Sequence, residues 1–134
     1  MKRSVWLSLS PYKYPVILYR GTWKQLRRYT KDNGLVDIGG EFPCHMGHVL
    51  CGEGGDPYSI IWLKSWSSTL EEHGALVHEC IHACMACLED RGVPLSMQHG
   101  GHEALTYLVE DLYKQCAYNL GTFNQGTLDK HLET

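Results

Sequence analysis

The sequence predicts a single α+β domain, with short extended segments in its first half and two long helices in its second half. Its 134 residues are enough for one domain that buries most of its apolar surface. The first half alternates β-prone segments with glycine and proline turns, whereas the second half has apolar residues at helical spacing. We expect a strand-and-helix half at about residues 1–66, a helical half at about 67–121, and a polar tail at 122–134.

The first half contains three predicted strands and one predicted helix. Residues 15–20 (PVILYR) predict a strand, and residues 48–51 and 59–64 predict two more around a Gly-Gly-Asp-Pro turn. The segment from Thr22 to about Asp32 predicts a short helix that Asn33-Gly34 ends. One face of this helix is basic, with Lys24, Arg27, Arg28 and Lys31. A solvated face is the usual explanation of such a stripe, and an acidic partner is the alternative.

The second half begins with a helix that we expect to be buried. Thr69 followed by Glu72 forms a capping-box sequence, which predicts a helix start near residue 70. The helix should end near Arg91, because Gly92 and Pro94 follow. Between residues 75 and 88 it is apolar on nearly all sides, and a helix of that kind is normally enclosed by the rest of the protein.

A second long helix follows from Glu103 and ends near Gly121. Its predicted core face consists of Leu105, Leu108, Val109, Leu112 and Cys116. A small antiparallel or mixed sheet packed on these two helices is the expected architecture.

The sequence His78-Glu79-Cys80-Ile81-His82 is the strongest chemical signal in the chain. Residues four apart lie on the same face of a helix, so both imidazoles can bind one metal ion. The glutamate beside the first histidine can then take a proton from water at the metal. With 8 histidines in 134 residues, such a spacing arises by chance in about 3 % of chains. We therefore predict a hydrolytic zinc site.

A catalytic zinc ion takes three protein ligands, so the motif needs one more. Metzincins have glycine three residues and histidine six residues after the second motif histidine, whereas Met85 and Leu88 occupy these positions here. A carboxylate from the next helix is the alternative, and Glu103 in its first turn could lie opposite the histidine pair. The rival third ligands are His102, His99 and Glu110.

The two motifs together resemble a known family. The segments Val77-His78-Glu79-Cys80-Ile81-His82-Ala83 and His102-Glu103-Ala104-Leu105-Thr106-Tyr107-Leu108 resemble the small zincin-fold metallopeptidase-like proteins of bacteriophages and prophages, which are similar to the gluzincin class. The likeness covers about residues 58–120 and implies a minimal zincin-like domain.

This resemblance implies a role for each motif residue. His78, His82 and Glu103 would be zinc ligands, and Glu79 would be the general base. Thermolysin-like enzymes have an aspartate four residues after the ligand glutamate, but Tyr107 stands at that position, so no such carboxylate is implied. Tyr107, His99 and His102 are candidates for stabilising a developing oxyanion, although Tyr107 could simply pack and the histidines could be solvated.

The six cysteines offer a competing zinc site. Cys84 and Cys87 form a CxxC, and Cys44 or Cys51 could complete a structural site with them. A redox CxxC normally lies at a helix N-terminus, whereas this one lies near a helix end. Buried free thiols that pack as small apolar groups are the simpler prediction.

These observations predict a zinc-dependent metallopeptidase-like hydrolase that cleaves peptide or protein amide bonds. The alternative is a non-catalytic zinc-binding assembly or regulatory module of a phage or prophage, which would bind a phage or host protein. A His-His-Glu set also suits Fe(II). The mild net charge of −3 argues against nucleic-acid and membrane partners, and we expect a cytoplasmic protein. The basic helix from Thr22 leaves a binder of nucleic acid or of an acidic partner as a third alternative.

Overall fold

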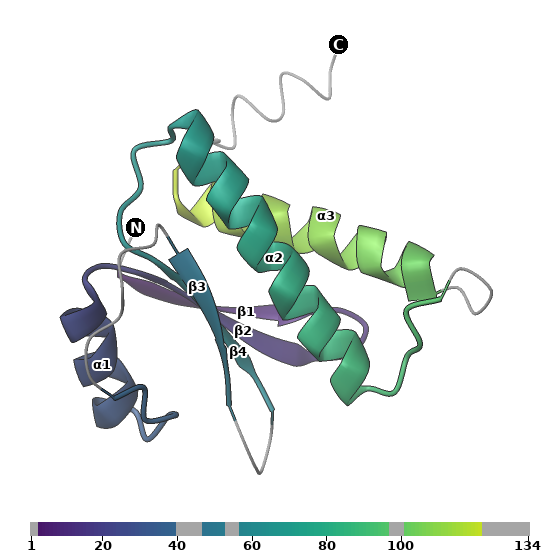
Figure 1. The fold of residues 1–134 in the computed structure, drawn as a ribbon, viewed down its shortest axis with the longest axis horizontal. Helices are drawn as coiled ribbons and strands as arrows, with labels where there is room; N and C mark the ends of the chain where they lie inside the picture. The colour runs from purple at the N-terminus through teal and green to yellow at the C-terminus, as the bar shows by residue number, and fades with distance from the viewer. Residues whose placement is uncertain (1–2, 40–46, 53–56, 97–100, 122–134) are drawn as a thin grey trace.

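Four strands form one mixed sheet in the order β1-β2-β4-β3 (Figure 1). The computed structural model describes residues 3–39, 47–52, 57–96 and 101–121. The elements follow the chain as β1 (Ser4–Leu9), β2 (Tyr14–Arg20), α1 (Trp23–Asp32), β3 (Gly47–Cys51), β4 (Ser59–Leu63), α2 (Leu70–Asp90) and α3 (Gly101–Asn119).

The strand directions follow from the connections between the strands. β1 and β2 are joined by a tight turn and pair antiparallel, and β3 pairs antiparallel with β4. β2 and β4 are parallel, which requires a long crossover, and α1 lies within it. β4 is buried at every position because it has a neighbour on each side and helices on both faces. β3 is therefore the edge strand at this end of the sheet.

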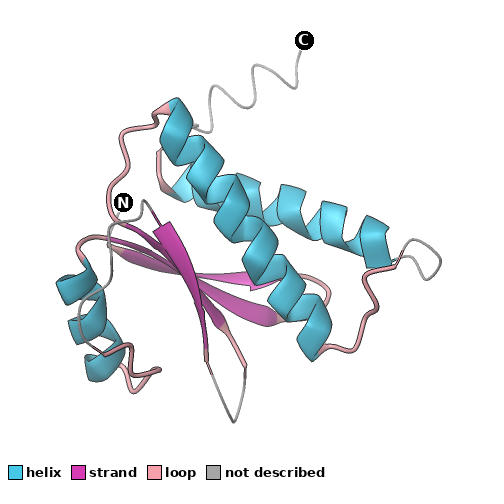
Figure 2. Cartoon of the chain, viewed as in Figure 1, coloured by secondary structure: helices cyan, strands magenta, loops and turns pink. Residues whose placement is uncertain are grey.

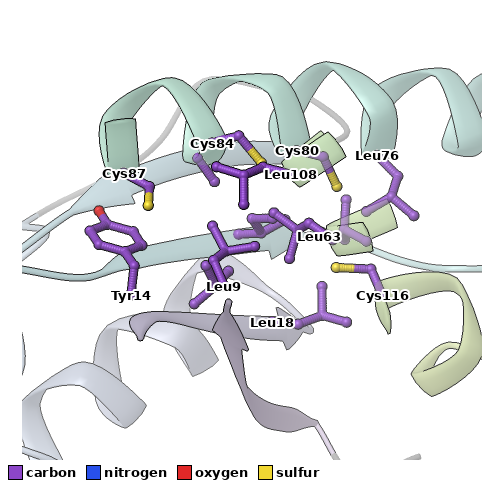
Figure 3. Close-up of a cluster of buried hydrophobic side chains, with 14 of the residues drawn as sticks. Leu9, Tyr14, Leu18, Leu63, Leu76, Cys80, Cys84, Cys87, Leu108 and Cys116 are labelled. Carbon is purple, nitrogen blue, oxygen red and sulfur yellow. The ribbon is translucent and has the colours of Figure 1, made fainter. Parts of the chain in front are cut away.

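Helices cover both faces of the sheet, with α1 on one face and α2 and α3 on the other (Figure 2). On the α2–α3 face, Leu9, Leu18 and Leu63 meet leucine and cysteine side chains from both helices (Figure 3). On the α1 face, Ile17, Ile60 and Trp62 form a separate cluster with Leu26. Successive strand residues alternate between these two cores, which is the two-residue period of a strand.

Each predicted helix is present, and the capping box predicted at Thr69 is confirmed. Thr22 caps α1 and Thr69 caps α2, and each makes both hydrogen bonds of a capping box. Glu72 completes the α2 box and is only 6 % exposed. Burial raises the pKa of Glu72, but hydrogen bonds from the amides of Thr69 and Ser67 and from nearby hydroxyls outweigh it, so the pKa lies below the ordinary value.

The prediction that α2 is buried on nearly all sides is wrong. Its inner face is enclosed, but Val77, Ile81 and Met85 are each 37–39 % exposed on the outer face. His78 and His82 are also exposed. The apolar composition predicted full burial, but α3 and the sheet together cover only one side of α2. The outer apolar residues therefore face solvent.

β1 was not predicted from the sequence. β1 has a mixed apolar and serine sequence, and it becomes a strand by pairing along its length with the strongly β-prone β2. The tail at 122–134 lies outside the described residues. No helix within the described ranges is both long and apolar enough to cross a membrane.

Candidate metal centre

His78 and His82 lie together on the solvent-facing side of α2. Their Nε2 atoms are 3.1 Å apart, and the ring centroids are 4.7 Å apart at an angle of 72°. One helical turn separates the two residues, so the helix alone brings the side chains onto one face. In this structure the two Nε2 atoms face each other in a hydrogen bond, one imidazole donating to the other.

The spacing of these nitrogens fits a tetrahedral zinc ion. Zinc binds histidine nitrogen at about 2.0 Å, so two nitrogens of a tetrahedral site are separated by roughly 3.3 Å. The observed 3.1 Å between the Nε2 atoms is close to that value. The pair therefore fits two of the ligands that zinc requires.

Glu79 lies beside the pair but points towards the protein. It is only 6 % exposed, although the preceding residue, His78, is exposed. A Cβ atom placed on Gly47 would lie 3.6 Å from Cγ of Glu79, so the Glu79 side chain packs against the first residue of the edge strand β3. The carboxylate is thus held between the histidine face of α2 and the start of β3.

Gly47 allows this close approach. A Cβ atom on Gly47 would lie 2.8 Å from the Trp62 carbonyl oxygen and 2.9 Å from Cδ2 of Leu63. Only glycine fits there without moving the strand. β3 forms an edge of the sheet, whereas its neighbour β4 is paired on both sides and buried.

The predicted third ligand is not brought to the histidine pair. Glu103 is exposed in the first turn of α3. Within the residues that the structure describes, no three His, Cys, Asp or Glu side chains form a group that could hold a metal ion. The assignment of Glu103 as a ligand therefore stays a prediction.

The crossing of α2 and α3 explains this placement (Figure 1). Tyr113 bonds His73 of α2, and Cys116 bonds Cys80, so the helices meet through the later turns of α3. Glu103 is ten residues before Tyr113, or about 15 Å along the helix. Cys80 is on the buried face of α2, whereas His78 and His82 are on the exposed face. α3 thus approaches α2 from the side away from the histidines.

The rival ligands are also placed by the structure. Glu110 is exposed and pairs with Lys114 of the next turn at 2.9 Å. His102 is exposed beside Glu103, and His99 lies outside the described residues. Tyr107 is 65 % exposed, so the alternative that it packs in the core is wrong. The roles suggested for these residues at the zinc site stay predictions.

A polar cluster at the start of α2 was not anticipated from the sequence. His73 Nδ1 lies 2.6 Å from the Tyr113 hydroxyl, and His73 Nε2 lies 2.9 Å from the Ser68 hydroxyl. The Trp66 ring meets the His73 ring edge-on, with centroids 4.9 Å apart. The cluster joins the N-terminal turn of α2 to α3. Trp66, Ser68 and His73 are close in sequence, whereas Tyr113 is distant and only the helix crossing brings it to them.

The cysteines of α2 lie on its inner face and confirm the simpler prediction. Cys80, Cys84, Cys87 and Cys116 are free thiols with no exposed surface (Figure 3). A hydrogen bond with Cys116, then burial, raises the pKa of Cys80, and burial is the main cause of a raised pKa at Cys84. Burial raises the pKa of Cys87 to about 11, although Arg91 lowers it in part. Cys44 lies outside the described residues.

Comparison with family models, with curated proteins and with solved structures gave no match for this chain.

Proposed function

We propose that this protein is a zinc-dependent hydrolase of peptide or protein amide bonds. The observation that carries the proposal is the His78–His82 pair, with 3.1 Å between the Nε2 atoms, beside the buried carboxylate of Glu79. Two nitrogen ligands and a general base are the parts that zinc hydrolysis requires from one helix. The phage metallopeptidase-like proteins that the sequence resembles supply the expectation that Glu103 completes the site.

In this proposal His78 and His82 hold the metal through Nε2. Zinc, when bound, would supply a Lewis acid that polarises a carbonyl group and lets water lose a proton near neutral pH. Glu79 accepts that proton at its carboxylate and passes it to the departing amine. Its low exposure limits the access of other water molecules, and its side chain packs against the start of β3.

The edge strand β3 supports a peptide as the substrate class. β3 has a sheet neighbour only on its β4 side within the described residues, and its start lies against Glu79. An extended peptide could pair with such an edge through backbone hydrogen bonds. The scissile bond would then lie near the carboxylate. We therefore place the substrate between β3 and the outer face of α2.

A non-catalytic zinc module is the second candidate. It is favoured by the apolar stripe of Val77, Ile81 and Met85, which borders the histidines and is partly exposed. Apolar surface of this kind suits a protein contact. Both candidates need the same metal ligands, and they differ in what Glu79 does.

Metal content and hydrolysis of matched variants test the proposal. Zinc measured by mass spectrometry on the purified protein should be about one ion per chain, and His78→Ala and His82→Ala should each lose it. Glu103→Ala tests the predicted third ligand separately. His73→Gln is the control, because His73 is on the same helix but bonds Ser68 and Tyr113. Unchanged zinc in both pair variants would contradict the site.

Hydrolysis separates the two candidate functions. With unfolded, fluorescein-labelled casein as a general peptide probe, Glu79→Gln should retain zinc and lose at least about 100-fold in rate. A Glu79→Gln variant that cleaves as fast as the wild type would remove Glu79 as the base. Zinc binding without cleavage of any probe would favour the module.

A further inference from the structure

Charge is segregated along the chain although the net charge is mild. Residues 3–39 contain seven cationic and two acidic side chains, whereas residues 70–119 contain two cationic and eight acidic ones. The first group lies on β1, β2, α1 and their turns, and the second on α2 and α3. Since α1 and the α2–α3 pair cover opposite faces of the sheet, the charges are separated in space as well (Figure 1).

Two neighbouring hollows in the surface collect most of the cations. One has a volume of about 830 Å³ and is lined by the basic stripe of α1 and by residues that follow the helix, among them Asp37. The other, of about 430 Å³, is lined by side chains from the ends of three strands and has no acidic residue in its wall. Seven cations line the two hollows, and one of them, Arg28, pairs with Asp32. The other six are called the basic face below: Arg3, Arg20, Lys24, Arg27, Lys31 and Lys64.

The sheet brings three of these cations together. The Arg20 amide donates to the Arg3 carbonyl at 2.7 Å, and the Gly21 amide donates to the Leu63 carbonyl at 3.0 Å. Arg3, Arg20 and Lys64 therefore lie at the same end of adjacent strands. Arg3 also bonds the Gln25 side chain, which lines the larger hollow. This contact joins the two hollows into one continuous surface.

No ion pair neutralises the basic face within the described part of the chain. The ion pairs there are Arg28–Asp32, Arg91–Asp90 and Lys114–Glu110. Arg28–Asp32 is long, at 3.9 Å, and both side chains are mostly exposed. Closely spaced like charges repel one another, so a surface of this kind gains free energy when an anion binds to it.

Aromatic side chains border the basic face. Trp6 is 54 % exposed, and its Nε1 donates to the Tyr29 hydroxyl at 3.0 Å. Tyr29 in turn packs against Tyr19, with ring centroids 5.0 Å apart. Burial raises the pKa of Tyr19, and the nearby Arg3 guanidinium lowers it by a smaller amount. The indole of Trp6 is therefore anchored by its nitrogen and offers much of its surface to solvent beside the cations.

We propose that the basic face binds single-stranded nucleic acid, with phosphates at the two hollows and a base stacked on Trp6. Cations that follow a groove, combined with an exposed aromatic ring, are the two elements of single-strand binding. An acidic protein would use the cations but has no particular need of the indole. A duplex would keep its bases stacked within the helix, out of reach of Trp6. The net charge argued against this partner because the acidic residues of α2 and α3 offset the basic residues when all charges are summed.

Salt dependence gives the first measurement. Fluorescence anisotropy would follow a labelled 20-nucleotide single-stranded DNA of mixed sequence titrated with the full chain. Each phosphate contact contributes a slope of about 0.7 in log Kd against log salt. If all six cations contact phosphates, raising salt from about 50 to 200 mM should weaken binding roughly 300-fold.

Charge-matched variants locate the surface. Lys24→Gln with Lys31→Gln, and separately Arg20→Gln with Lys64→Gln, should each lower the salt slope by about 1.4. Lys13→Gln with Lys114→Gln removes the same charge outside the hollows and should leave the slope nearly unchanged. Trp6→Ala should weaken single-strand binding about tenfold through lost stacking. Circular dichroism melting curves would confirm that every variant is folded.

Four results would overturn the proposal. The protein could show no saturable binding at about 50 mM salt, or the basic-face and control variants could lose the same amount of affinity. The protein could also bind duplex DNA as tightly as single-stranded DNA, or a polyglutamate peptide of the same charge could compete as well as unlabelled single-stranded DNA. The last result would identify an acidic protein as the partner. A labelled RNA of the same sequence would distinguish the two kinds of nucleic acid. Because no variant touches His78, Glu79 or His82, failure here is separate from failure of the proposed hydrolysis.

Discussion

The two faces of α2 have similar apolar content but opposite environments. The inner face carries Leu76 and the buried thiols, which are fully enclosed by the sheet and α3. The outer face carries His78 and His82 among the partly exposed Val77 and Ile81. The inner face fixes the position of the helix, and the outer face is open to solvent, where the proposed function would place a metal ion. A helix can be apolar all round and still present a site, because its neighbours decide which side is covered.

The largest expected effect compares the two faces directly. Leu76→Ala should lower the free energy of unfolding by about 2–5 kcal/mol, because it leaves a cavity in a closed core. Ile81→Ala should cost less than about 1 kcal/mol, since its side chain is already 37 % exposed and alanine favours the helix. Urea unfolding measures both. Equal losses would mean that the outer face is covered in solution.

The next effect concerns thiol reactivity on the inner face. With a pKa of about 11, Cys87 should be about 0.1 % thiolate at pH 8 and should react with iodoacetamide about 200-fold more slowly than an unperturbed thiol. The rate should rise nearly tenfold per pH unit up to about pH 10 while the protein stays folded. Peptide mapping by mass spectrometry gives the rate at Cys87 itself, with glutathione as the reference. A rate equal to that of glutathione would show that this face opens.

Gly47 of β3 lies against Glu79, between the inner and outer faces of α2, so a substitution there should shift β3 relative to the helix. Gly47→Ala should cost about 1–3 kcal/mol, because the new methyl group would press on the Trp62 carbonyl and on Leu63. If the proposed hydrolysis is right, the same change should lower the rate by shifting β3 against Glu79. Gly74→Ala in α2 is the control, since nothing lies within 4 Å of its Cβ position. It should stabilise the helix by up to about 1 kcal/mol, and a loss as large as that of Gly47→Ala would refute the explanation.

The smallest effect tests the start of α2. Glu72→Gln should cost about 1 kcal/mol at pH 7, because it removes a charge that accepts amide hydrogen bonds at the helix N-terminus. The pKa of Glu72 is lowered on folding, so its contribution is present above the ordinary value of 4.5 and is lost as pH falls through the folded value. Urea titrations at pH 7 and pH 3 should show the difference shrinking. Glu71→Gln, at the exposed neighbour, should change stability less at both pH values.

Local patterns predicted much of the fold. Strands β2, β3 and β4 and all three helices were expected near their observed ends, because capping boxes, glycine stops and side-chain periodicity act within a few residues. β1 was missed, because its pairing with β2 is a contact between segments and not a property of Ser4–Leu9. The same limit applied to Glu103. Its place in the first turn of α3 followed from the sequence, but the angle at which α3 crosses α2 did not.

The sequence by itself determined the spacing of His78, Glu79 and His82, because a helix converts a four-residue interval into a shared face. It also determined the two ends of α2 and the row of basic residues along α1. Only the tertiary structure decided that the histidines face solvent, that Glu79 lies against β3, and that Arg3, Arg20 and Lys64 meet at one end of the sheet. The physical reason is that helix geometry is set by hydrogen bonds between near neighbours. Exposure and charge clustering depend instead on which distant segments pack against each face.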